Sequence, residues 1–105
     1  MSRFVYEPKK KMQVTFERTI EPITREISNA DGSEKKNFSI LFITKNRIVN
    51  DAHVRLEGTN LEAVFTLANG NWYYAADTTP THMRIQEGYI PSILKVLVAE
   101  APNFN

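Results

Sequence analysis

The clearest pattern in the N-terminal half of the chain is an alternation of hydrophobic and polar side chains. From Met12 to Ile20 every second residue is apolar, with Arg18 as the one exception. A period of two is typical of a β-strand with one buried face. Pro22 cannot donate a hydrogen bond to a neighbouring strand, so it predicts an edge, a bulge or a bend. Residues 23–28 alternate again and are expected to continue the strand beyond it.

Two further strands are predicted after a turn at residues 29–33. Asp31-Gly32 provides the positive φ that hairpin turns need. Residues 38–43 are a dense run of β-branched and aromatic side chains, which indicates a central strand. After a break at residues 45–47, residues 48–57 alternate once more. One face carries Ile48, Ala52, Val54 and Leu56, and the other carries Asp51, His53, Arg55 and Glu57.

Residues 59–68 fit two different structures. Thr59 and Glu62 have the spacing of a helix capping box, and apolar residues follow at helical intervals. However, Asn69-Gly70 lies between two apolar runs, which is the strongest short signal for a β-hairpin. We favour the hairpin. It places Leu67 opposite Trp72 and Phe65 opposite Tyr74.

The C-terminal part favours a helix. Residues 83–85 read as a short strand that ends before Gly88. Pro91 suits the first turn of a helix and Pro102 suits its end. Between them the apolar residues recur at helical spacing, and only Val96 lies off the expected core face. That face comprises Ile90, Ile93, Leu94, Leu97, Val98 and Ala101.

These elements predict an α+β fold. A mainly antiparallel β-sheet of five to six strands carries one C-terminal amphipathic helix on one face. The 105 residues contain no repeat and no Pro-, Gly- or Ser-rich linker, so residues 1–105 are expected to form a single domain. Residues 1–11 read as a loose arm, because an apolar patch at residues 4–6 is followed by three lysines.

Composition excludes several classes of function. The absence of cysteine removes disulfides, zinc–thiolate sites and thiol nucleophiles. No apolar run approaches the length of a membrane span, and the N-terminus lacks the apolar region of a signal peptide, so we expect no membrane and a cytoplasmic location. The four glycines are isolated, which excludes phosphate-binding fingerprints. We therefore expect no cofactor, no metal and no catalytic residue.

Histidine is the usual acid–base group near neutral pH, and the chain has two. His53 lies two residues from Asp51, so both side chains are expected on the same side of a strand, where a His–Asp pair can support proton transfer. His82 follows several threonines in an expected loop. Neither histidine has metal-ligand spacing, and we interpret both as solvent-facing residues.

Charge is distributed unevenly along the chain. Residues 1–55 hold eleven Lys and Arg against seven Asp and Glu, whereas residues 56–105 hold two against five. Basic residues recur at expected turns of the first half, and aromatic residues follow in the second, a combination that single-strand binders use for phosphate contact and base stacking. The candidate binding-surface residues are Lys9, Lys10, Lys11, Lys35, Lys36, Lys45, Arg47, Trp72, Tyr73 and Tyr74.

Two functional hypotheses follow. The first is a non-enzymatic protein-binding module, such as a small inhibitor, adaptor or accessory subunit that masks or bridges the surface of a protein partner. The alternative is a single-stranded DNA- or RNA-binding protein, which requires the basic residues to converge on the aromatic face. A homodimer is also considered, in which the arm at residues 3–6 pairs with an edge strand of a second subunit.

Overall fold

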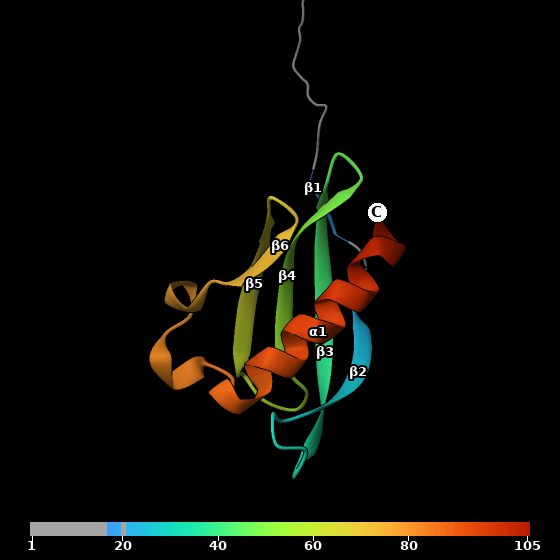
Figure 1. The fold of residues 1–105 in the computed structure, drawn as a ribbon. Helices are drawn as coiled ribbons and strands as arrows, with labels where there is room; N and C mark the ends of the chain where they lie inside the picture. The colour runs from blue at the N-terminus through green and yellow to red at the C-terminus, as the bar shows by residue number, and fades with distance from the viewer. Residues whose placement is uncertain (1–16, 20) are drawn as a thin grey trace, which may run out of the picture.

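The computed structural model describes residues 17–19 and 21–105. An antiparallel β-sheet forms one layer, and a single α-helix lies diagonally across one of its faces (Figure 1). The predicted α+β fold is therefore confirmed. The strands are β1 (Glu17–Thr19), β2 (Ile23–Ser28), β3 (Lys35–Lys45), β4 (Ile48–Leu56), β5 (Glu62–Ala68) and β6 (Asn71–Tyr74). The helices are the 3-10 turns η1 (Ala76–Thr78), η2 (Thr81–Met83) and η3 (Glu87–Tyr89), the α-helix α1 (Ile90–Glu100) and the 3-10 turn η4 (Ala101–Phe104).

One edge of the sheet is built from two short strands placed end to end. β1 pairs with the end of β3, and β2 pairs with its beginning, so the sheet order is β1 or β2, then β3, β4, β5 and β6. Pro22 lies in the break between β1 and β2, where no ladder hydrogen bond is needed. The predicted bend and the continued strand at residues 23–28 are thus confirmed, whereas residues 12–16 and Ile20 lie outside the described residues.

The Asn69-Gly70 hairpin is present as predicted. Both turn residues have positive φ, and Leu67 pairs with Trp72 while Phe65 pairs with Tyr74. The helical alternative for residues 59–68 fails because Thr59 makes a local turn instead of a helix cap. Its hydroxyl donates to the Leu56 carbonyl at 2.8 Å and accepts from the Leu61 N–H at 3.0 Å.

The inward face of β4 differs from the prediction at its first residues. The register between β3 and β4 shifts between Ile43 and Thr44, so that Asn50 is an extra residue on β4. For the residues of β4 that precede this bulge, it exchanges the side chains that point toward the core with those that point toward solvent. Val49 is buried, and Ile48, which was expected in the core, has 59% of its surface exposed.

The helix confirms the predicted core face in part. Ile93 and Leu97 are fully buried against the sheet, together with aromatic side chains of β3 and β5. Val98, however, is 63% exposed, whereas Val96 is half-buried and packs against the core. The helix crosses the sheet diagonally (Figure 1), and the burial of these residues shows that the Val96 side of α1 faces the sheet while the Val98 side faces outward.

The segment between β6 and α1 forms 3-10 turns instead of the strand expected at residues 83–85. Only one bridge links it to the sheet, between Arg84 and Glu62, and the Ile85 N–H donates to the Glu62 carbonyl at 3.2 Å. Pro80 begins one 3-10 turn and Gln86 precedes the next, which leaves no length for a ladder. Buried Ile85 anchors the segment by its side chain.

Candidate functional site

The predicted basic residues do not gather in one place. Lys9, Lys10 and Lys11 lie outside the described residues. Lys35 and Lys36 lie at the first end of β3, and Lys45 and Arg47 lie at the other end and in the turn that follows. An eleven-residue strand spans roughly 33 Å, so these two pairs of cations are far apart.

The predicted aromatic residues are divided between the two faces of β6. Trp72 and Tyr74 face the helix side, where the Trp72 ring lies 6.4 Å from Phe42 and the Tyr74 ring lies 5.3 Å from Phe65. Both rings are half-buried and pack against the core. Tyr73 alone is turned to the opposite face, with 50% of its surface exposed. A cationic groove lined by three stacking rings is therefore not formed by the described residues.

The histidines make no catalytic arrangement within residues 17–19 and 21–105. His53 is exposed on the face without a helix, and Asp51 accepts a hydrogen bond from Asn50 at 3.2 Å. His82 lies exposed in η2. In the same residues no group of three or more His, Asp and Glu side chains is placed to hold a metal ion.

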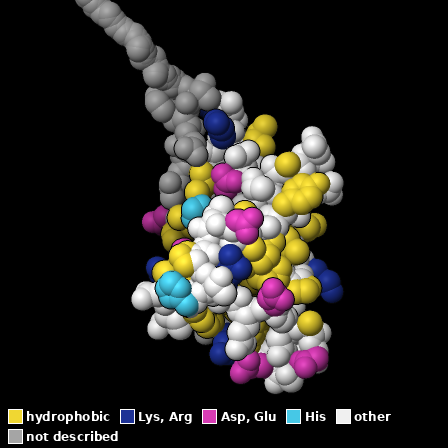
Figure 2. Space-filling model, turned by 90° about the vertical axis from the view of Figure 1, so that its left-hand side faces the viewer, with side chains coloured by type: hydrophobic (Ala, Val, Ile, Leu, Met, Phe, Trp, Pro, Cys, Tyr) yellow, Lys and Arg dark blue, Asp and Glu magenta, His cyan; other side chains and the backbone are white. Residues whose placement is uncertain are grey.

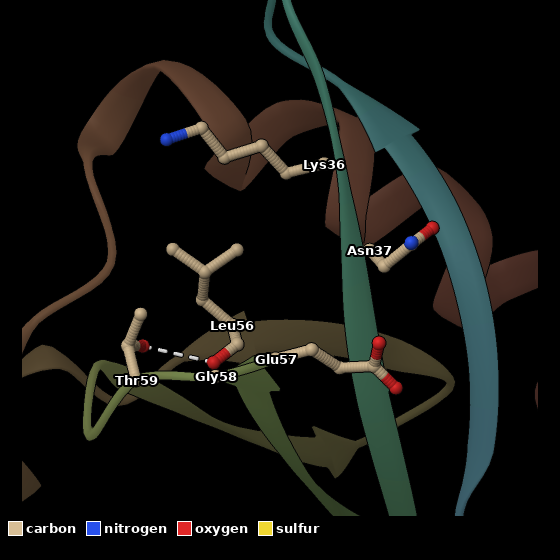
Figure 3. A pocket seen from close by; sticks show the side chains of 6 residues that line it. All are labelled: Lys36, Asn37, Leu56, Glu57, Gly58 and Thr59. Carbon is tan, nitrogen blue, oxygen red and sulfur yellow. Dashed lines mark hydrogen bonds between the residues drawn. The ribbon is translucent and has the colours of Figure 1, made fainter.

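A depression of about 540 Å³ lies where β3 begins and the β4–β5 turn passes by (Figure 3). It is wide and shallow. Lys36 and Glu57 extend from its two sides and point away from each other (Figure 3), and Glu57 accepts a hydrogen bond from Thr24 at 3.2 Å. Lys36 lies 4.0 Å from Glu34. Lys36 and Glu57 thus have partners of their own and do not converge on a common ligand position.

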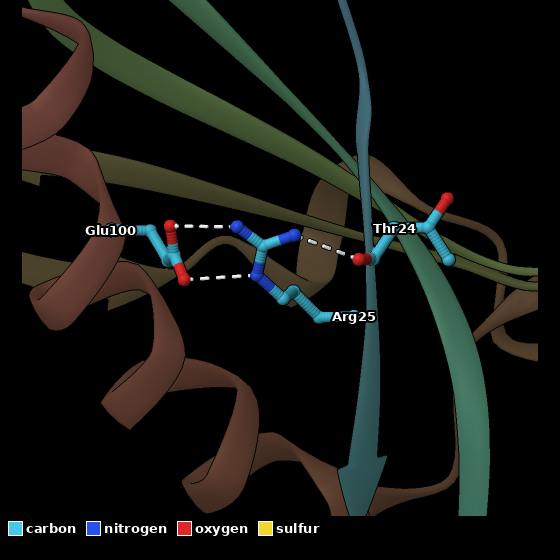
Figure 4. Close-up of polar contacts among 3 residues, drawn as sticks. All are labelled: Thr24, Arg25 and Glu100. Carbon is cyan, nitrogen blue, oxygen red and sulfur yellow. Dashed lines mark hydrogen bonds and ion pairs between the residues drawn. The ribbon is translucent and has the colours of Figure 1, made fainter.

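One flank of α1 is fastened to the sheet by an ion pair. Arg25 on β2 donates from Nε and Nη2 to the carboxylate of Glu100, at 2.9 and 3.1 Å, and from Nη1 to the Thr24 carbonyl at 2.8 Å (Figure 4). The hydrogen bonds from Arg25 lower the pKa of Glu100 against the opposing effect of burial. The same contact raises the pKa of the Arg25 guanidinium. We call this side, with Val96 and Glu100, the β2 flank.

The beginning of α1 is held by a second polar contact. The buried Tyr89 donates its hydroxyl to Glu34 at 2.7 Å, and its ring lies 5.2 Å from Phe38. Burial, strengthened by the bond to Glu34, raises the pKa of Tyr89 to about 12. The phenol is therefore a neutral donor at physiological pH, and it ties the start of the helix to the β2–β3 turn.

The opposite flank of α1 is open. Pro91, Leu94 and Val98 follow at intervals of three and four residues, which places them on one stripe of the helix, away from Glu100 and toward β6. Leu94 is half-buried, and Pro91 and Val98 are exposed. We call this stripe the β6 flank. Together with Trp72 and Tyr74 it forms the β6–α1 surface.

Figure 2 shows the side of the molecule on which β6 lies, and hydrophobic side chains form a broad patch there. At one end of the β6–α1 surface, Tyr74, Glu87, Ile90 and Pro91 line a cavity of about 210 Å³. The Tyr74 hydroxyl is buried, and it has no hydrogen-bond partner among the described residues. Glu87 is exposed, and within the same residues its carboxylate has no ion pair.

The backbone of β6 adds directional bonding groups to this surface. The Ala75 N–H donates to the Val64 carbonyl at 2.8 Å, which identifies Ala75 and Tyr73 as residues that bond to β5. In an antiparallel ladder, consecutive residues direct their N–H and C=O groups to alternate sides of the strand. Trp72 and Tyr74 therefore present unpaired donors and acceptors at an edge where no described strand lies.

This surface provides what a sheet edge needs to bind an extended peptide. Main-chain groups of β6 are available as donors and acceptors, and an apolar stripe of α1 lies beside them; these are the two features that edge-strand recognition uses. The sequence pattern identified Trp72, Tyr73 and Tyr74 but missed Pro91, Leu94 and Val98. Val98 was assigned to the core, and its exposure depends on the crossing angle of α1, which no local pattern encodes.

The chain was compared with known proteins. No family model, no curated protein and no solved structure matches it. Among the described residues no helix is long and apolar enough to cross a membrane.

Proposed function

We propose that the protein is a non-enzymatic protein-binding module and that the β6–α1 surface receives a partner protein. The observation that carries the proposal is the edge of β6, to which no described strand adds, beside the exposed apolar flank of α1. A partner contributes an extended segment that adds to the sheet next to β6. Its alternate side chains enter the groove between β6 and α1.

The distribution of cations favours this function over the binding of single-stranded nucleic acid. The two pairs of basic residues on β3 and its turn lie at opposite ends of a strand, so they do not form one continuous row. A single-strand groove needs cations along a row of stacking rings. The addition of a strand to a sheet edge needs unpaired main-chain groups and an apolar surface beside them, and β6 and α1 provide these two features.

A matched pair of substitutions tests the location of the surface. Val98 and Ile48 are both large exposed hydrophobic residues, with 63% and 59% exposure. Val98 lies on the β6 flank, whereas Ile48 lies at the β3–β4 turn. We expect Val98→Asp to abolish partner capture and Ile48→Asp to retain it, because both add the same charge and only one lies on the proposed surface.

The measurement is quantitative mass spectrometry of proteins captured by each variant after nuclease treatment. A protein bound by the unmodified chain and by Ile48→Asp, but lost from Val98→Asp, supports the proposal. Equal retention by both variants contradicts it. Anisotropy of a labelled single-stranded oligonucleotide provides the second readout, and a salt-sensitive increase with the unmodified chain would favour the alternative function.

A further inference from the structure

We propose that the N-terminal arm, Arg3-Phe4-Val5-Tyr6, of a second copy of this chain adds as a strand to the free edge of β6 and competes there with the partner. This inference rests on the proposed function, because it names a ligand that regulates the same surface. It assigns the arm to the β6–α1 surface and predicts a symmetric dimer in which each copy lends its arm to the other.

The arm has the composition that the edge requires. Phe4, Val5 and Tyr6 have high β-propensity and carry no charge, and the arm contains no proline before Pro8. Alternation along a strand places Phe4 and Tyr6 on one face and Val5 on the other. The β6–α1 surface is apolar on the helix side, where the two aromatic rings fit against Trp72 and Leu94.

The direction of the chain brings opposite charges together. β6 runs from the hairpin turn toward Tyr74, which lines the cavity that also contains Glu87. A strand that adds antiparallel to β6 begins at that end, so Arg3 arrives beside the carboxylate of Glu87, which has no ion pair with any described residue. Residues 1–16 hold four basic residues and one acidic residue, whereas the second half of the chain is acidic. The complementarity therefore extends beyond one pair.

The topology favours a second copy over the arm's own sheet. The chain enters the sheet as β1, on the edge opposite to β6, and β3, β4 and β5 lie between them. The arm would have to cross about 19 Å of its own sheet to reach β6, at about 4.8 Å for each strand spacing. Exchange between two copies needs no such crossing, and it closes with two identical contacts.

The first test uses Tyr6→Pro and Tyr6→Thr in the 105-residue chain, followed by sedimentation equilibrium. In the proposed strand Tyr6 shares the helix side with Trp72 and Tyr74, so its N–H faces β6, and proline removes this donor and fixes φ. We expect proline to weaken the dimer at least about tenfold more than threonine, which loses the same ring but retains the donor and a β-branched shape. Unchanged circular dichroism of both variants is expected to verify that folding is intact.

A charge exchange then distinguishes the second copy from the chain's own arm. Arg3→Glu alone and Glu87→Arg alone should each weaken self-association about fivefold to tenfold. An equal mixture of the two variants should restore it, because both contacts of the mixed dimer pair opposite charges. An arm that folds onto its own sheet gives no restoration on mixing.

The proposal is overturned if the unmodified chain sediments as a monomer at all concentrations, or if the mixture stays as weak as its components. Neither result affects the proposed function, which the Val98→Asp and Ile48→Asp pair tests separately. Conversely, if Val98→Asp loses partner capture but still forms the dimer, the arm and the partner do not bind the same surface. That result would overturn the competition proposed here.

Discussion

The two flanks of α1 have very different neighbours. On the β2 flank, Glu100 receives two hydrogen bonds from Arg25, and Val96 packs against the core. On the β6 flank, Leu94 is only half-buried and Val98 is 63% exposed. The helix is thus sealed along one side and open along the other. The contacts on the β2 flank fix the position of α1, and they thereby position the β6–α1 surface as well.

The largest expected effect separates the core of α1 from its open flank. Leu97 is fully buried, and Leu97→Ala should lower the free energy of unfolding by about 2–5 kcal/mol. Leu94→Ala should cost clearly less, because its side chain already contacts solvent. Urea titration of both variants measures the difference. Equal costs would mean that the β6 flank is as closed as the core.

A second effect concerns the unpaired hydroxyl beside the cavity. Tyr74→Phe removes a buried oxygen that has no partner among the described residues, and it should raise the free energy of unfolding by about 1 kcal/mol. Tyr73→Phe is the control, since that side chain is half exposed and the change should be close to zero. Thermal unfolding of the two variants and of the unmodified chain measures these changes in stability. A destabilised Tyr74→Phe would show that the hydroxyl already has a partner.

Tyr89, at the start of α1, should make the stability of the fold depend on pH in the alkaline range. The pKa of Tyr89 is about 12 in the folded chain and 10.0 ordinarily, so the folded state retains this proton longer. Its contribution to stability is therefore complete below about pH 10 and is lost as the pH rises toward 12. Tyr89→Phe should remove this part of the pH dependence. If the two stability profiles fall in parallel above pH 10, the assignment is incorrect.

The smallest effect is expected at acid pH from the ion pair. The pKa of Glu100 is lowered in the folded chain, so its contribution is present above the ordinary carboxyl pKa and is lost as the pH falls through the folded value. Glu100→Gln should flatten the acid side of the stability profile only slightly, because both side chains are partly exposed. Denaturant midpoints at several pH values provide the measurement. Glu26→Gln is the control, because this exposed carboxylate has no ion pair among the described residues.

Local signals predicted most of the fold. Asn69-Gly70 and Pro22 act through φ and the missing N–H, which depend on the residue alone, and both features were found where expected. Ile48 was misplaced because a bulge is a property of two strands together. Residues 83–85 failed as a strand because β6 already occupies the adjoining edge of β5. Long-range pairing decided both cases.

The candidate site was less predictable for a similar reason. The aromatic run of β6 could be identified by composition, but its division between two faces leaves two of the three rings half-buried against the core. Val98 fitted the apolar stripe of an amphipathic helix as well as Leu97 did. Only the angle at which α1 crosses the sheet distinguishes a core residue from a surface one.

The contact between Arg25 and Glu100 also has a consequence for how the chain folds. It joins residues 75 positions apart, whereas β2, β3, β4 and β5 each pair with the next strand along the chain. Consecutive hairpins close short loops, so the sheet can assemble early, and helix docking must close the longest loop. The transition state is then expected to contain the hairpins without the docked helix. Leu97→Ala should therefore accelerate unfolding and leave the rate of folding nearly unchanged.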